Sequence, residues 1–259
     1  MGSDEDSGAG KRRDRKPPRD KSTLDELRRR MAAIPGRGEA AAERMPRDAE
    51  LRREALAVPP ALAELLPDGG LVKGSVVAYS GASSLLAGLL AAVTESGGHA
   101  AVVGMPRLGL LAAVEMGAQL QRLAVVADPG PDPVEVAAVL LDGLDLVVLG
   151  LAGAAVAPSR TRVIAARARS KGATLVVTDG RWPNPSLRVD TRIAGYGGLG
   201  AGRGRLRSLS LEVAVRGKAG PPCHGRIELR PSPSRVEWVP LETVTASDEL
   251  TVEAHGAAS

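Results

Sequence analysis

Short apolar runs alternate with helix-length stretches along the middle of this 259-residue chain, and this alternation constrains the fold more than any other feature. The runs are rich in Val, Leu and Ala, and their apolar residues are consecutive. Such continuity is typical of strands buried on both faces, as in a parallel sheet covered by helices. The predicted strands are residues 75–80, 99–104, 123–127, 145–149 and 173–178, and the predicted helices are 83–96, 107–120, 132–142 and 159–171. The sequence therefore predicts an α/β fold with a mostly parallel central sheet flanked by helices.

After Gly180 the pattern changes to an alternation of apolar and polar residues. This period of two is typical of half-buried antiparallel strands, and it covers residues 187–194, 206–216 and 225–230. We expect these strands to extend one edge of the sheet. The segment Gly195–Gly204 contains six glycines and is predicted to be a mobile loop.

The predicted α/β domain covers residues 61–240, between a charged N-terminal segment and an acidic tail. Residues 1–60 are predicted to be disordered, apart from a short helix at about 22–34, because their first part holds too few apolar residues for a core. Residues 241–259 are predicted to be flexible. The short helix has an apolar stripe formed by Leu24, Leu27, Met31 and Ile34. That stripe needs a partner surface, either this protein's own domain or another chain.

The composition narrows the chemistry available. Two Trp, two Tyr and no Phe leave almost no aromatic surface on which bases could stack. Cys223 is the single cysteine, which excludes an intramolecular disulfide and a cysteine-cluster metal site. We see no signal peptide and no apolar run of membrane length, so the expected location is the cytoplasm and no membrane partner is expected. Residues 151–240 carry 16 Lys and Arg against 5 Asp and Glu, a balance that suits nucleic acid, an acidic partner or simply a solvated surface.

The turn after the first predicted strand is the place where a phosphate-binding loop would lie, since a strand, a glycine and a helix follow one another there. With Gly81 aligned to the first glycine of G-x-x-x-x-G-K-[ST], Leu86, Ala87 and Gly88 occupy the positions of Gly, Lys and Ser/Thr. The loop therefore lacks both the lysine and the hydroxyl that would bind phosphate and Mg²⁺. Ser83 and Ser84 are expected to cap the following helix. We predict no nucleotide cofactor at this degenerate loop.

The remaining candidate residues form no catalytic set. The strands ending at Gly104 and Gly150 carry no carboxylate there, and Asp179, after the fifth strand, is expected to be a loop or helix-capping residue. His99, His224 and His255 share no ligand-like spacing. Cys223 and His224 are adjacent in a stretch that we expect to be a turn, where neighbouring side chains seldom face one substrate. The sequence thus predicts no catalytic residues, no metal site and no enzymatic activity.

The order of these segments resembles the RecA-type recombinase core over roughly residues 61–230. LLPDGGLVKGSVVAYSGASSLLAG stands at the Walker A element, LDLVVLG at Walker B and ATLVVTDG at the strand of the polar sensor residue. More narrowly, the WPNPSLRVDTRIAGYGGLG stretch and the RIEL ending resemble the ImuA-prime family, the actinobacterial RecA-like accessory proteins of the inducible mutasome. This resemblance implies a RecA-like core and a role in the DNA damage (SOS) response.

The resemblance also implies partners. They are ImuB, an inactive Y-family polymerase homologue that binds the sliding clamp, and an error-prone replicative-type polymerase, with RecA as a further candidate. We expect a non-catalytic adaptor for translesion synthesis, with the Leu24 stripe or the acidic tail as the docking element. Arg203, Arg205 and Arg207 are candidates for weak electrostatic DNA contact. Two alternatives remain open: a nucleotide-binding regulator of recombinase filaments, which would use the backbone amides of Gly81–Ser84, and a SulA-like inhibitor of cell division.

Overall fold

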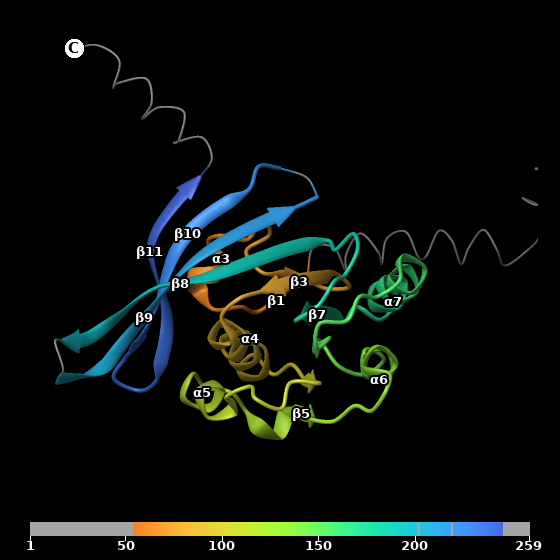
Figure 1. The fold of residues 1–259 in the computed structure, drawn as a ribbon, viewed down its shortest axis with the longest axis horizontal. Coiled ribbons are helices and arrows are strands. Elements are labelled where there is room, and N and C mark those ends of the chain that lie inside the picture. Colours follow the sequence, from red (N-terminus) through yellow and green to blue (C-terminus); the bar gives the residue numbers. More distant parts are fainter. Residues whose placement is uncertain (1–53, 201–202, 219, 246–259) are drawn as a thin grey trace, which may run out of the picture. The chain divides into compact units, whose positions relative to one another are not determined.

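The computed structural model describes residues 54–200, 203–218 and 220–245 (Figure 1). A nine-stranded sheet in the order β11-β10-β9-β8-β3-β7-β6-β4-β5 runs through this part of the chain. The first elements on it are β3 (Val76–Ser80), α4 (Ser83–Glu95), β4 (Ala100–Val103), α5 (Leu110–Glu115), the 3-10 helix η1 (Leu120–Arg122), β5 (Leu123–Val126), α6 (Pro133–Leu140), β6 (Leu146–Gly150), α7 (Pro158–Lys171) and β7 (Thr174–Thr178). They are followed by β8 (Leu187–Gly200), β9 (Arg203–Gly217), β10 (Cys223–Pro231) and β11 (Val236–Thr245).

The predicted parallel half of the sheet is confirmed. Strands β3, β4, β5, β6 and β7 pair in parallel, and each begins and ends within one residue of its predicted bounds. All the residues of β4, β6 and β7 are buried, as their continuous apolar character requires. The prediction of burial on both faces is wrong for β5, in which Val125 is 46% exposed, because β5 is the last strand of the sheet.

Helices cover both faces of this half, and each face has its own hydrophobic core. One core joins α4 and α5 to the sheet and includes Leu86, Leu90 and Val102. The other lies beneath α6 and α7 and includes Leu141 and Ile164. The helices stand where they were predicted, but α5 is shorter than the predicted 107–120. It is bounded by Gly109 at its N-cap and by Gly117, which has a left-handed φ of 103°.

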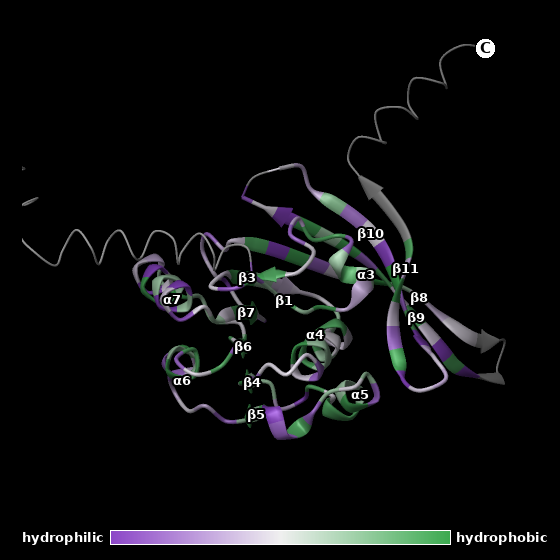
Figure 2. Cartoon of the chain, turned by 180° about the vertical axis from the view of Figure 1, so that it is seen from behind, coloured by the Kyte–Doolittle hydropathy of each residue, from purple (hydrophilic) through white to green (hydrophobic). Residues whose placement is uncertain are grey.

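The antiparallel half extends one edge of the sheet, as predicted, and it begins beside β3. It is larger than the sequence indicates. Strand β8 is parallel to β3 and antiparallel to β9, so the change of direction occurs one strand later than expected. Hydrophilic and hydrophobic residues alternate along β9 and β10 (Figure 2). The prediction of a mobile loop at Gly195–Gly204 is wrong for the described residues of this segment, because β8 continues to Gly200 and β9 begins at Arg203. Two register shifts, after Ile193 and after Gly197, absorb the glycines within this long hairpin.

The folded domain extends beyond both of its predicted bounds. Ahead of residue 61, β1 (Ala55–Leu56) pairs with β2 (Leu71–Val72), and Leu56 and Val58 lie in a hydrophobic core beside α3 (Pro60–Ala63). Beyond residue 240, β11 continues to Thr245 and pairs with β10. The sequence missed β11 because Pro240 and Glu242 interrupt its apolar pattern. The predicted helix at 22–34 lies outside the described residues.

Candidate functional site

The turn between β3 and α4 is shorter than the predicted phosphate loop. Strand β3 ends at Ser80 and helix α4 begins at Ser83, so only Gly81 and Ala82 separate them. Gly81 has a left-handed φ of 103°. The helix thus begins before the positions that the phosphate-loop alignment assigns to Gly, Lys and Ser/Thr. Those positions hold Leu86, Ala87 and Gly88, which are buried within α4.

Neither serine caps this helix, so the capping prediction is wrong. Ala82 occupies the N-cap position and makes no side-chain cap hydrogen bond. Ser83 and Ser84 are the first two helical residues, and their side chains therefore stand one and two positions too late to be the N-cap.

Thr191 of β8 closes the turn. The Ala82 backbone N–H donates to Thr191 Oγ1 at 2.8 Å, and the Thr191 hydroxyl donates to the Ser80 carbonyl at 2.9 Å. The backbone of Thr191 approaches even more closely, because a Cβ built on Gly81 would lie 1.9 Å from its carbonyl oxygen. Only glycine fits at residue 81. The atom that leaves no room for a side chain there is the carbonyl oxygen of Thr191, and so the requirement for glycine comes from the protein's own packing.

Tyr79 completes the same hydrogen-bonded cluster. Its hydroxyl donates to the Ala82 carbonyl and lies 3.1 Å from Thr191 Oγ1. Burial raises the pKa of the Tyr79 hydroxyl far above its ordinary value, and the contact with Thr191 opposes this only in part. Next to it, Ser80 Oγ donates to Asp190 Oδ1 at 2.7 Å. The polar groups around this turn therefore join β3 to β8.

Close backbone packing also explains why the neighbouring strand ends carry glycine where a metal-binding carboxylate would be expected. A Cβ on Gly150 would lie 2.7 Å from Met105 Cγ and 2.8 Å from the carbonyl oxygen of Gly104. Asp179, after β7, is an exposed loop residue with a left-handed φ of 52°, and its carbonyl accepts the Gly153 N–H. In residues 54–200, 203–218 and 220–245, no three His, Cys, Asp or Glu side chains are grouped as metal ligands would be.

The other candidate residues are distributed over separate places. Cys223 and His224 begin β10 and do not form the predicted turn, so their side chains point to opposite faces of the sheet. Arg203, Arg205 and Arg207 lie on β9 and not in a loop, and Arg205 and Arg207 are exposed. The stripe of Leu24, Leu27, Met31 and Ile34 lies outside the described residues.

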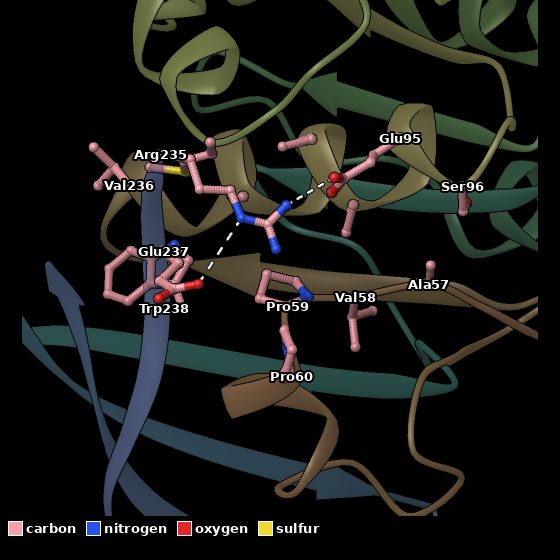
Figure 3. A pocket seen from close by; sticks show the side chains of 14 residues that line it. Ala57, Val58, Pro59, Pro60, Glu95, Ser96, Arg235, Val236, Glu237 and Trp238 are labelled. Atoms are coloured by element: carbon pink, nitrogen blue, oxygen red, sulfur yellow. Dashed lines mark hydrogen bonds and ion pairs between the residues drawn. The ribbon is translucent and has the colours of Figure 1, made fainter. Parts of the chain in front are cut away.

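A groove between β11, α4 and the segment before α3 was not predicted (Figure 3). It has a volume of about 320 Å³, and its floor is apolar. Arg235 crosses its rim, paired with Glu95 at 2.7 Å and with Glu237 at 3.9 Å. Trp238 forms one wall, and its indole N–H is buried without a hydrogen-bond partner among the described residues. The lining residues are Ala57, Val58, Pro59, Pro60, Gly88, Ala91, Ala92, Glu95, Ser96, Met116, Arg235, Val236, Glu237 and Trp238.

The sequence matches one family model and is similar to a mycobacterial protein. Residues 64–184 match the family model described as the MT3502 N-terminal domain. The uncharacterized protein Rv3395c of Mycobacterium tuberculosis (strain ATCC 25618 / H37Rv) is 53% identical over 164 residues, which are 60% of this chain and 80% of the relative. The chain belongs to the family of this mycobacterial protein.

The part of the chain that matches the family model contains the β3–α4 turn but not Thr191, which closes it. It ends at residue 184, before Thr191 on β8 and Trp238 on β11. Sequence reasoning missed both residues. Thr191 had a detectable signal, because it occupies an inward position in the alternation Leu187, Val189, Thr191.

Within the part of the chain that the structure describes, no helix has the length and apolarity needed to cross a bilayer.

Proposed function

We propose that this protein is a non-catalytic RecA-like accessory protein in damage-induced mutagenesis. In this role it supports error-prone translesion synthesis in the cytoplasm by contacting ImuB and the mutasome polymerase. The observation that carries the proposal is the hydrogen bond from the Ala82 N–H to Thr191 Oγ1. In a phosphate-binding turn, the amides at the helix N-terminus would be directed to the nucleotide.

Two features support the loss of nucleotide chemistry at this turn. A phosphate there would compete with Thr191 for the Ala82 N–H, and it would meet the buried Ala87 where a phosphate-binding lysine belongs. The arrangement of a mostly parallel sheet between helices, followed by antiparallel strands, agrees with the RecA-like resemblance of the sequence. A scaffold that keeps this fold without the nucleotide machinery suits an adaptor better than an enzyme.

Nucleotide binding provides the first test. A ligand that binds only the native state raises its melting temperature. We expect ATP with Mg²⁺ to leave the melting temperature unchanged and to undergo no hydrolysis. Stabilisation by ATP that is lost in Ser83→Pro, which removes a backbone N–H at the first helical residue, would instead favour a nucleotide-binding regulator of recombinase filaments.

Partner capture provides the second test. We expect co-purification from damaged cells to recover ImuB, and Leu27→Asp/Met31→Asp or removal of residues 246–259 to diminish that capture. The deletion begins after Thr245, because residues 241–245 belong to β11 and their loss would damage the sheet. Arg29→Asp, off the apolar stripe, is the control. Recovery of the tubulin-like division protein in place of ImuB would favour a SulA-like inhibitor, and undiminished capture by both altered chains would contradict the proposed docking elements.

A further inference from the structure

Two arginines face each other across the β8–β9 pair. Arg188 of β8 is directly opposite Arg216 of β9 in the register of these antiparallel strands. Both side chains are exposed, and Lys218 follows two residues after Arg216. Like charges directly opposite one another destabilise an antiparallel pair. The sheet thus carries an unfavourable juxtaposition at this place.

A second pair of arginines, one on β8 and one on β10, has a carboxylate between its members. Further along, Glu212 of β9 lies between Arg192 of β8 and Arg226 of β10 in the strand register. Arg192 donates to Glu212 Oε2, and Arg226 donates to Glu212 Oε1 at 3.0 Å. These two arginines hold the pKa of the Glu212 carboxyl below its ordinary value, Arg192 having the larger effect. A carboxylate between two guanidinium groups is therefore how this sheet accommodates neighbouring cations.

No described carboxylate takes that place between Arg188 and Arg216. The one nearby is Asp190, whose Oδ2 lies 3.8 Å from Arg216 Nη2 while its Oδ1 accepts the hydrogen bond of Ser80. Among the described residues, neither Arg188 nor Lys218 takes part in an ion pair. Of these three cations, Arg216 alone has a described carboxylate within ion-pair distance.

A hollow lies beside these three cations. It has a volume of about 340 Å³ and is lined by Asn184, Pro185, Arg188, Arg216, Gly217 and Lys218. Asn184 has a left-handed φ of 52° and carries an amide that can donate hydrogen bonds. The Ser186 N–H donates to the Val76 carbonyl, so this hollow adjoins the start of β3, at the opposite end of the strand from the turn closed by Thr191.

We propose that this hollow is a binding site for an oxyanion of the phosphate class, held by Arg188, Arg216 and Lys218. A guanidinium group presents paired donors that match phosphate oxygens, and an ammonium group adds a compact charge. The oxyanion supplies beside Arg188 and Arg216 the negative charge that Glu212 supplies between Arg192 and Arg226. The site is independent of the degenerate phosphate loop, and the inference does not depend on the proposed function.

Phosphate groups of this class come from two sources, a free phosphate or the phosphodiester backbone of a nucleic acid. Both satisfy the same three cations. They differ in reach and in salt dependence, because a bound polyanion releases counterions and its affinity falls steeply with salt. The experiment therefore has one arm for each source.

The first arm measures the melting temperature of the full chain in sodium phosphate against sodium chloride of equal ionic strength. We expect phosphate to raise the melting temperature of the wild type. Arg188→Gln and Lys218→Gln should each weaken phosphate binding about fivefold or more, because each removes a charge-assisted contact. Arg230→Gln, an exposed arginine on β10 outside the hollow, makes the same change of charge and should have little effect.

Arg188→Gln also has a readout that a merely structural role would not produce. In chloride alone, we expect this variant to melt no lower than the wild type, because the substitution removes the repulsion from Arg216 while phosphate binding is lost. An equal response of Arg188→Gln, Lys218→Gln and Arg230→Gln to phosphate would overturn the site. So would the lack of any binding in both arms.

The second arm measures the fluorescence anisotropy of a labelled single-stranded oligonucleotide over a range of salt. Binding that Arg188→Gln weakens, with a shallower salt dependence than in the wild type, supports the phosphodiester source. Phosphate binding in the first arm with no oligonucleotide binding supports the free phosphate. Oligonucleotide binding that Arg230→Gln weakens as much as Arg188→Gln contradicts the site.

Discussion

Gly88 of α4 lies directly beneath the indole of Trp238 on β11. A Cβ built on Gly88 would stand 2.8 Å from Trp238 Nε1, 2.9 Å from Trp238 Cδ1 and 3.2 Å from Pro59 Cγ. The closeness of the helix to the last strand of the antiparallel half thus depends on the lack of a side chain at residue 88. The sequence placed this glycine at the hydroxyl position of a phosphate loop, whereas the fold uses it for packing.

Gly88→Ala should destabilise the domain. Overpacking of a filled site costs about 1–3 kcal/mol, and the better helix propensity of alanine offsets about 1 kcal/mol at most. We expect a net loss in the free energy of unfolding, measured by urea denaturation. Gly143→Ala is the control, because a Cβ on Gly143 has no atom within 4 Å. Equal midpoints for the two variants would show that the indole moves aside freely.

Thr191→Val should destabilise the joint between β3 and β8. The substitution keeps the shape of the side chain but leaves the Ala82 N–H and the Ser80 carbonyl without their shared hydroxyl. Leaving such groups unpaired costs about 1–3 kcal/mol in the free energy of unfolding. Thr191→Ser keeps the hydroxyl and should lose much less stability. A valine variant as stable as the serine variant in urea would contradict the role given to these hydrogen bonds.

Tyr79 should make the domain sensitive to alkali. Its pKa is raised by burial, so the folded state keeps the phenol proton that the unfolded chain releases at about pH 10. Stability is therefore fully present below that pH and falls as the pH rises above it, by up to about 1.4 kcal/mol per pH unit. Tyr79→Phe should remove this part of the alkaline loss, whereas Tyr196→Phe, at an exposed residue, should keep it. Urea midpoints between neutral and alkaline pH measure the difference, and an unchanged alkaline loss in Tyr79→Phe would refute the assignment.

The parallel half was predictable because its signal is local. Runs such as Leu146–Gly150 are apolar throughout, and burial on both faces is the only arrangement that accommodates them. The strands of the antiparallel half were harder, since Pro240 interrupts β11 and glycines interrupt β8. Their pairing depends on partners far along the chain, which a single segment does not specify.

The contacts at the β3–α4 turn and at the Arg188–Arg216 pair could not be predicted, because they join residues that are far apart in the sequence. The degenerate motif at Gly81–Gly88 was visible, but its closure by Thr191, 110 residues beyond Gly81, was not. Likewise, the opposition of Arg188 and Arg216 appears only once β8 and β9 are in register. Sequence reasoning thus found where the turn departs from the phosphate-loop motif, and the structure adds the contacts that Gly81 and Gly88 make there.

The ion pair between Asp142 and Arg167 should contribute to the loss of stability in acid. Arg167 of α7 donates from Nε to Asp142 Oδ1 at 2.9 Å and from Nη2 to Oδ2 at 2.6 Å, and it thereby lowers the pKa of the Asp142 carboxyl. A lowered folded-state pKa means that the contribution is present above the unfolded value of about 3.9 and is lost as the pH falls through the folded value. Asp142→Asn should therefore reduce the urea midpoint at neutral pH, and the difference from wild type should shrink in strong acid. Asp68→Asn, at an exposed residue before β2, is the matched control. A difference between Asp142→Asn and wild type that stays constant from neutral pH into strong acid would rule out the carboxylate charge as its cause.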